Sequence, residues 1–244
     1  MKKLLKWELK QTFQSKGFWG FGITLTLINN IFLIITSIDG ELKGFELFMQ
    51  GCSDYNSFIL LFIGIFAGIH VAGAFEDREI QAAVMAGNSR FNILAVKLFS
   101  YSLSVAVFSI CAMGASLIVG VLTNERVTFV DDFFGEVILR IAAYTLVEVA
   151  FVSICFFLSM LVKTLGAAIG VNLVSMIVLN SVGQMFISKE WAVNFMKFTP
   201  LGQTFLLLGD ASTKNLIVSV VASILGLAVT VTLSYIKFRK EELK

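Results

Sequence analysis

The chain has 244 residues, of which 57% are hydrophobic and only 15% are charged, and its formal net charge is +2. Soluble domains usually carry about 25% charged residues, so this chain has too much apolar surface for a water-soluble core of its size. The small net charge and the lack of a basic stretch interleaved with aromatic residues argue against nucleic-acid binding. The apolar residues occur in long blocks, which are typical of helices that cross a bilayer core about 30 Å thick.

The first sixteen residues, 1–16, are too polar to cross a membrane. On a helical wheel their lysines gather within an arc of roughly 100°, and Trp7 and the leucines occupy the rest. The lysines in this arc are Lys2, Lys3, Lys6 and Lys10. The pattern predicts an interfacial helix that turns its lysines toward anionic lipid headgroups, and a solvated leader with no defined depth is the alternative. A secretory signal peptide is not expected, because the apolar run that follows is too long and has no small-residue cleavage pattern.

Six apolar segments follow, and they predict an all-α polytopic membrane protein with a single domain over 1–244. The expected spans are 18–38, 57–75, 93–122, 133–162, 165–187 and 215–236. The third and fourth are long for one crossing, and Lys97 is expected to extend its amine toward the headgroups. Cys52 falls in the predicted outer loop before the second span.

A moderately apolar stretch, 188–214, separates the fifth span from the sixth and contains Pro200, the only proline. We predict a short re-entrant helical hairpin that dips into the outer interface. Its backbone groups need helical hydrogen bonds or a protein cover at that depth.

The basic residues predict the orientation of the spans. With the N-terminus inside, thirteen Lys and Arg residues fall on the cytoplasmic side and five on the outer side. This asymmetry follows the positive-inside rule for short loops. An even number of crossings then returns the C-terminus to the cytoplasm as well.

The loop between the second and third spans, 76–90, holds the strongest functional signal. It opens on four consecutive charged residues, Glu76, Asp77, Arg78 and Glu79. A short stretch of good helix formers follows, which Gly87 ends, and Asn88 or Ser89 can cap the next helix before Arg90. This pattern predicts a small helix parallel to the membrane that transmits force from a soluble partner. An ordinary solvated loop is the alternative.

This loop resembles the first cytoplasmic loop of ABC-2 type permeases. In that family an acidic residue leaves the second span, as Glu76 does, and a small-Ser-Arg entry with a later Lys matches 87–90 and Lys97. The basic start, the six spans and the outer hairpin extend the resemblance over nearly the whole chain as a layout. Many members have Gly-Thr where this chain has Arg78 and Glu79.

The resemblance implies the permease subunit of an ATP-driven exporter in a bacterial inner membrane, with an amphipathic or hydrophobic substrate such as an antimicrobial peptide. A second, identical or different permease chain and cytoplasmic ABC ATPase subunits would complete it. The chain has no phosphate-binding G-x-x-x-x-G-K-[ST] motif, so ATP and Mg²⁺ would bind to the ATPase. No catalytic residue or cofactor is expected here. The residues that would couple to the ATPase are Glu76, Asp77, Arg78, Glu79 and Arg90.

Ionisable residues inside the spans are costly and need partners. Glu136 and Arg140 are four residues apart and can pair on one helix face, whereas Glu148 has no partner on its own helix. They belong either to a substrate path or gate or to structural contacts. His70 is expected to bond a neighbouring helix. Five amides are expected to join helices, namely Asn29, Asn30, Asn172, Asn180 and Gln184.

Other classes of function remain as alternatives. An ion-coupled carrier or channel would use Arg140, Glu148 and His70 to relay protons. An intramembrane enzyme would need a nucleophile or metal set, which a single histidine and three scattered cysteines do not provide. A membrane scaffold without a transport role is the third alternative.

Overall fold

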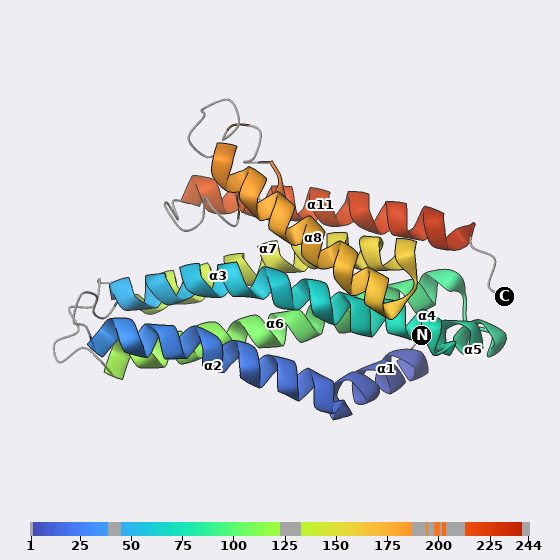
Figure 1. Ribbon diagram of the computed structural model, residues 1–244. Helices are drawn as coiled ribbons and strands as arrows, with labels where there is room; N and C mark the ends of the chain where they lie inside the picture. Colours follow the sequence, from blue (N-terminus) through green and yellow to red (C-terminus); the bar gives the residue numbers. More distant parts are fainter. Residues whose placement is uncertain are drawn as a thin grey trace.

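The computed structural model describes residues 2–38, 45–122, 133–186, 194, 198–200, 202–203 and 213–240. Within this part of the chain every regular element is a helix, which confirms the predicted all-α class. The long helices run side by side in a bundle (Figure 1). The first helix, the end of the last helix and a short helix in mid-sequence all lie at one end of this bundle.

The N-terminal segment forms α1 (Lys2–Gln14), and only Ser15 separates it from α2 (Lys16–Ile38). The chain turns at Ser15, so that α1 lies at an angle to α2 (Figure 1). Phe13 and Phe18 pack edge to face across this turn, with ring centroids 4.8 Å apart. All four lysines of α1 are exposed, as the interfacial-helix prediction requires.

The second apolar segment begins earlier than predicted. Helix α3 (Phe45–Ala67) starts twelve residues before the expected position 57, and it continues through the π-helix η1 (Gly68–Ala72) into α4 (Gly73–Glu76). The placement of Cys52 in a loop is wrong, because Leu47, Phe48 and Cys52 are fully buried on α3. These apolar residues recur at helical spacing, and the polar residues between them made the stretch resemble a loop.

Helices α6 (Arg90–Leu122) and α7 (Phe133–Val162) form the middle of the bundle. Helix α6 packs against α1, α2, α3 and α7. Helix α7 packs against α6, α8 (Leu165–Phe186) and α11 (Thr213–Arg239). The boundaries predicted for these four helices agree with the observed ones within three residues.

Five helices in the described part of the chain are long and apolar enough to cross a membrane, and they lie in α2, α3–α4, α6, α7 and α11. The apolar stretch of α8 that qualifies, Leu165–Leu179, is shorter. Most of the predicted hairpin 188–214 lies outside the described residues. Of its described residues, Pro200 contacts Gly226 near the midpoint of α11, and the buried Gln203 accepts a hydrogen bond from Ser219.

Two of the five amides join helices as predicted. Asn29 Nδ2 donates to Ser116 Oγ at 2.9 Å, which links α2 to α6. Asn172 Nδ2 donates to Gly64 O at 3.2 Å and to Ser159 Oγ at 2.7 Å, which links α8 to α3 and α7. Asn30 was predicted wrongly, since it donates to Thr26 O within α2. The side chains of Asn180 and Gln184 are outside the described residues.

The contact between η1 and α8 leaves no room for a side chain at Gly68. A Cβ there would lie 2.4 Å from Ile169 Cγ1 and 3.1 Å from the Ile169 backbone nitrogen. We therefore expect Gly68→Val to lower the free energy of unfolding by about 1–3 kcal/mol, the usual cost of overpacking. Thermal unfolding in detergent measures this loss. Gly114→Ala, where a Cβ meets nothing within 4 Å, is the control, and equal stability of both variants would contradict the prediction.

Candidate functional site

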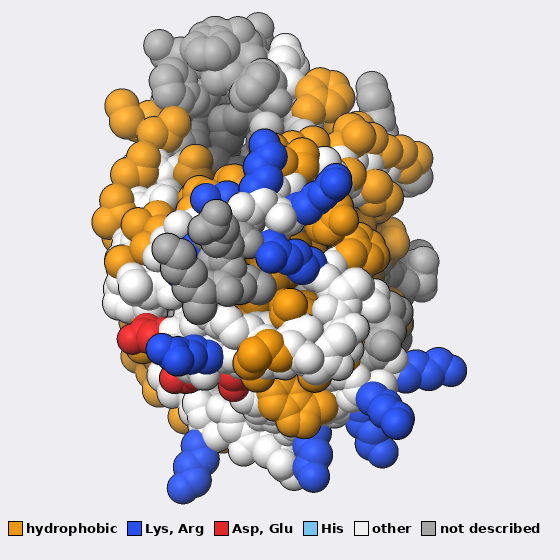
Figure 2. All heavy atoms as spheres, turned by 90° about the vertical axis from the view of Figure 1, so that its right-hand side faces the viewer, with side chains coloured by type: hydrophobic (Ala, Val, Ile, Leu, Met, Phe, Trp, Pro, Cys, Tyr) orange, Lys and Arg blue, Asp and Glu red, His pale blue; other side chains and the backbone are white. Residues whose placement is uncertain are grey.

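Among the described residues, most of the exposed basic side chains gather at the end of the bundle where α1 lies, which we call the basic end. Figure 2 shows this face, with Lys and Arg side chains spread over it and few acidic ones. The exposed cations there are Lys2, Lys3, Lys6, Lys10, Arg78, Lys237, Arg239 and Lys240. A candidate site for a soluble partner or for anionic lipid therefore lies at this end.

The predicted short helix is present at the basic end as α5 (Glu79–Met85). Arg78 turns the chain from α4 into α5 with a left-handed backbone, at φ 59°. Gly87 leaves α5 at φ +84°, a conformation that glycine adopts without strain. Ser89 Oγ then accepts a hydrogen bond from Asn92 N at 3.2 Å and caps α6, which confirms one of the two predicted caps.

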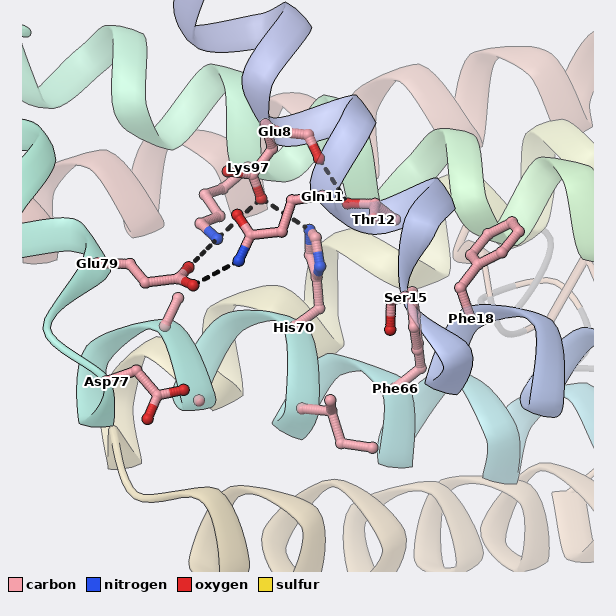
Figure 3. A pocket seen from close by; sticks show the side chains of 13 residues that line it. Glu8, Gln11, Thr12, Ser15, Phe18, Phe66, His70, Asp77, Glu79 and Lys97 are labelled. Atoms are coloured by element: carbon pink, nitrogen blue, oxygen red, sulfur yellow. Dashed lines mark hydrogen bonds and ion pairs between the residues drawn. The ribbon is translucent and has the colours of Figure 1, made fainter.

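A buried ion cluster joins α1, α5 and α6 (Figure 3). Lys97 of α6 is 7% exposed, and its Nζ lies 2.8 Å from Glu8 Oε1 of α1 and 3.1 Å from Glu79 Oε2 of α5. Glu8 is 2% exposed. Gln11 Nε2 of α1 donates to Glu79 Oε1 at 2.5 Å and closes a second link between α1 and α5. One lysine thus holds carboxylates from two separate helices.

His70 borders this cluster from the π-helix. Its Nε2 lies 3.5 Å from Glu8 Oε1, and its ring stacks against Phe66 and Tyr101. A π-helix inserts one residue into a helical turn and often marks a functional position. His70 thus faces Glu8 of the neighbouring α1, but its Nε2 makes no hydrogen bond among the described residues, so the predicted bond stays a prediction.

A cavity of about 180 Å³ lies among these groups. Its polar walls come from α1, from the segment between η1 and α5, and from α6 (Figure 3). Asp77 lines it beside Glu79, and Ser15 and Phe18 lie on the α1–α2 side. Within the described part of the chain no three His, Cys, Asp or Glu residues are placed to hold a metal ion. The arrangement is suited to joining helices electrostatically.

Two of the predicted coupling residues, Glu76 and Arg90, bind to the ends of other helices at the basic end. Glu76 Oε2 accepts a hydrogen bond from Leu165 N at 2.9 Å and so caps the start of α8. Arg90 Nη1 donates to Phe238 O at 2.8 Å and to Arg239 O at 3.1 Å, at the end of α11. Each charge suits the helix terminus that it meets, since carboxylates favour N-termini and cations favour C-termini. Asp77 and Arg78 are exposed.

The predicted residues inside the spans do not form one cluster with His70. Glu148 is buried between α6 and α7, where it is hydrogen-bonded to Ser109. Glu136 and Arg140 belong to α7, but their side chains lie outside the described residues, so their pairing remains a prediction.

Three members of the ion cluster were not predicted from the sequence, namely Glu8, Gln11 and Lys97. The expectation that Lys97 extends toward the headgroups is wrong, because its amine turns inward to the two carboxylates. The sequence does contain a signal for the pairing of Glu8 with Lys97. Glu8 is the single acidic residue of α1, and it lies four residues before Thr12 on the face that turns away from the lysines. Glu8 on the lysine-free face of α1 and Lys97 inside an apolar segment, both expected at the same membrane surface, are candidates for pairing.

The fold and this site define the chain as an all-helical membrane protein with several spans and an ion cluster at one end. It belongs to the family described as "Protein of unknown function (DUF2705)", whose sequence profile matches residues 20–243. No curated protein matches the chain with significant similarity.

Removing the charge of Lys97 should release α1 from the bundle. Lys97→Met leaves Glu8 buried without a counter-ion, and breaking a buried pair in this way costs about 3–5 kcal/mol. We expect a lower unfolding temperature and faster tryptic cleavage at the α1 lysines. Adding Glu8→Gln should restore part of the stability, because the unpaired carboxylate is then gone. Lys240→Met, at an exposed position, is the control, and an equal effect of both lysine variants would refute the role of the cluster.

Proposed function

We propose that this chain is the membrane-spanning permease subunit of an ATP-driven ABC exporter of the ABC-2 type. It moves an amphipathic or hydrophobic substrate, with antimicrobial peptides as the leading class, across or out of the membrane. A separate cytoplasmic ATPase subunit binds ATP and Mg²⁺, and a second permease chain completes the membrane part. The observation that carries this proposal is α5, a short helix fixed at the basic end between two long spans.

The proposed topology has six spans, the hairpin 188–214 on the outer side and both termini in the cytoplasm of a bacterial cell. The 22 residues of α8 support a sixth crossing, since roughly 20 residues span the bilayer core. The contact of Pro200 with Gly226, halfway along α11, supports a hairpin that enters the membrane. The gathering of exposed cations at one end supports a cytoplasmic basic end (Figure 2).

The backbone around α5 supports the resemblance to ABC-2 permeases. Many members have glycine at the position of Arg78, and here Arg78 adopts φ 59°. Glycine reaches this left-handed region without the steric cost of a side chain. The departure from the family pattern at Arg78 therefore changes the residue and keeps a backbone that glycine would favour.

The proposed mechanism transmits force from the ATPase through the ion cluster. A push on α5 moves Glu79, which is bound to Lys97 of α6 and to Gln11 of α1. Lys97 also holds Glu8, so α1 follows α5. Glu76 and Arg90 connect the same end to α8 and α11. A movement of the loop would then reach the start of α8 and the end of α11 together.

The exposed tip of α5 offers a surface on which to test ATPase docking. Met85 is 83% exposed there, and Met185 is 73% exposed at the far end of α8. We expect Met85→Asp to reduce co-purification of the ATPase at least tenfold while leaving thermal stability unchanged. Met185→Asp is the matched control with normal ATPase binding. If no ATPase binds the wild-type chain at all, the exporter proposal fails.

Charge reversal at Glu76 and Arg90 should uncouple ATP hydrolysis from transport. In Glu76→Lys with Arg90→Glu, the caps on α8 and α11 become repulsive, so the pushed loop no longer moves these helices. We expect ATP hydrolysis to continue while export of a fluorescent amphipathic peptide from liposomes falls. Lys240→Glu is the control for an added negative charge. Unchanged export with both charges reversed would exclude this coupling role.

A further inference from the structure

Glu148 lies at the centre of the bundle, far from the basic end. It is 1% exposed, and at 1.5 Å per residue it is roughly 21 to 22 Å from either end of α7. Its neighbours Val147, Phe151 and Val152 are fully buried. A charge at this depth costs several kcal/mol unless it is paired.

The hydrogen-bond partners of Glu148 indicate where its proton is. A serine hydroxyl has one hydrogen to donate. Ser109 Oγ lies 2.9 Å from Val105 O, one turn back on α6, and it is also hydrogen-bonded to Glu148 Oε2. Val105 O and an ionised carboxylate both only accept, so the single serine hydrogen cannot serve both contacts at once. A protonated Glu148 supplies a second hydrogen, which allows both contacts to be hydrogen bonds.

The other oxygen of this carboxyl leads to the same assignment. Glu148 Oε1 is buried, and among the described residues it has no hydrogen-bond partner. An ionised carboxylate would leave this oxygen charged and without a donor, and an unsatisfied charged group is the most expensive kind to bury. A neutral carbonyl oxygen in the same position costs much less.

No described side chain supplies a counter-ion to Glu148. The charged or titratable groups on the described parts of the elements packed against α7 include Glu46, His70, Arg90, Lys97, Tyr101, Lys237 and Arg239. Lys97 is bound to Glu8 and Glu79, and Arg90 to carbonyls of α11. The side chain of Arg140 is outside the described residues, and its backbone lies eight residues, or about 12 Å, from Glu148 along α7.

We propose that Glu148 is an intramembrane proton-binding site, a neutral carboxylic acid whose O–H donates to Ser109 Oγ and joins α7 to α6. The ligand of this site is a proton. The site holds it while α6 and α7 stay in contact, because ionisation would leave a charge between the two helices. Release of the proton requires the helices to separate and admit water. The protonation state of Glu148 therefore reports whether this interface is closed.

The proposed state has a distinctive reactivity. A carboxylic acid adds across a C=N bond of a carbodiimide: its oxygen bonds to the central carbon, its proton passes to a nitrogen, and an O-acylisourea forms. A hydrophobic reagent, dicyclohexylcarbodiimide, partitions into the membrane and should label Glu148 at neutral pH. A water-soluble carbodiimide should instead favour the exposed carboxyl of Asp77 at the basic end.

Infrared difference spectroscopy of the full chain in liposomes at neutral pH is the deciding measurement. Subtracting Glu148→Gln from the wild type should reveal the carbonyl band of a protonated acid, whereas loss of carboxylate bands would overturn the proposal. Ser109→Ala removes the acceptor and should shift the acid band, which keeps the test valid if the glutamine variant does not fold. Mass spectrometry of wild-type protein treated with dicyclohexylcarbodiimide gives a second readout of the same state.

Discussion

The arrangement of the basic end depends on one buried cation. Lys97 leaves the early part of α6 and turns inward between Glu8 and Glu79, so α1 and α5 are held by the same amine. A lysine in this position cannot stay buried alone, and neither can Glu8, because each charge makes the burial of the other tolerable. The position of α1 at the end of the bundle therefore follows from an electrostatic requirement as well as from the packing of Phe13 on Phe18.

The helices were predictable from sequence because each long span shows itself locally, by a run of apolar residues. For this reason the predicted boundaries of α6, α7, α8 and α11 agree closely with the observed ones. The predicted start of the second span was wrong because the first part of α3 alternates buried residues, such as Phe48 and Cys52, with polar ones. The composition of such an amphipathic stretch does not distinguish a helix from a loop. Local chemistry also located α5, because Gly87 and Ser89 stop one helix and start the next.

The candidate site was less predictable because it depends on contacts between distant residues. Glu8 and Lys97 are far apart in the chain, and nothing local to either states that they meet. The charges of 76–90 were identified as a group, yet their partners were not. Glu76 bonds a backbone amide of α8, and Arg90 bonds backbone carbonyls of α11. Backbone groups carry no residue-specific signal, so only the folded arrangement reveals such bonds.

The π-helix at Gly68–Ala72 sets the rotation of everything that follows it on the same rod. If these same residues followed ordinary α-helical geometry, the extra residue would no longer be absorbed in the wide turn, and each later side chain would turn by about 100° about the axis. His70 would leave Glu8, and Glu76 would point away from the first amide of α8. This single wide turn thus acts as an angular spacer that aligns two faces of one helix with two different neighbours.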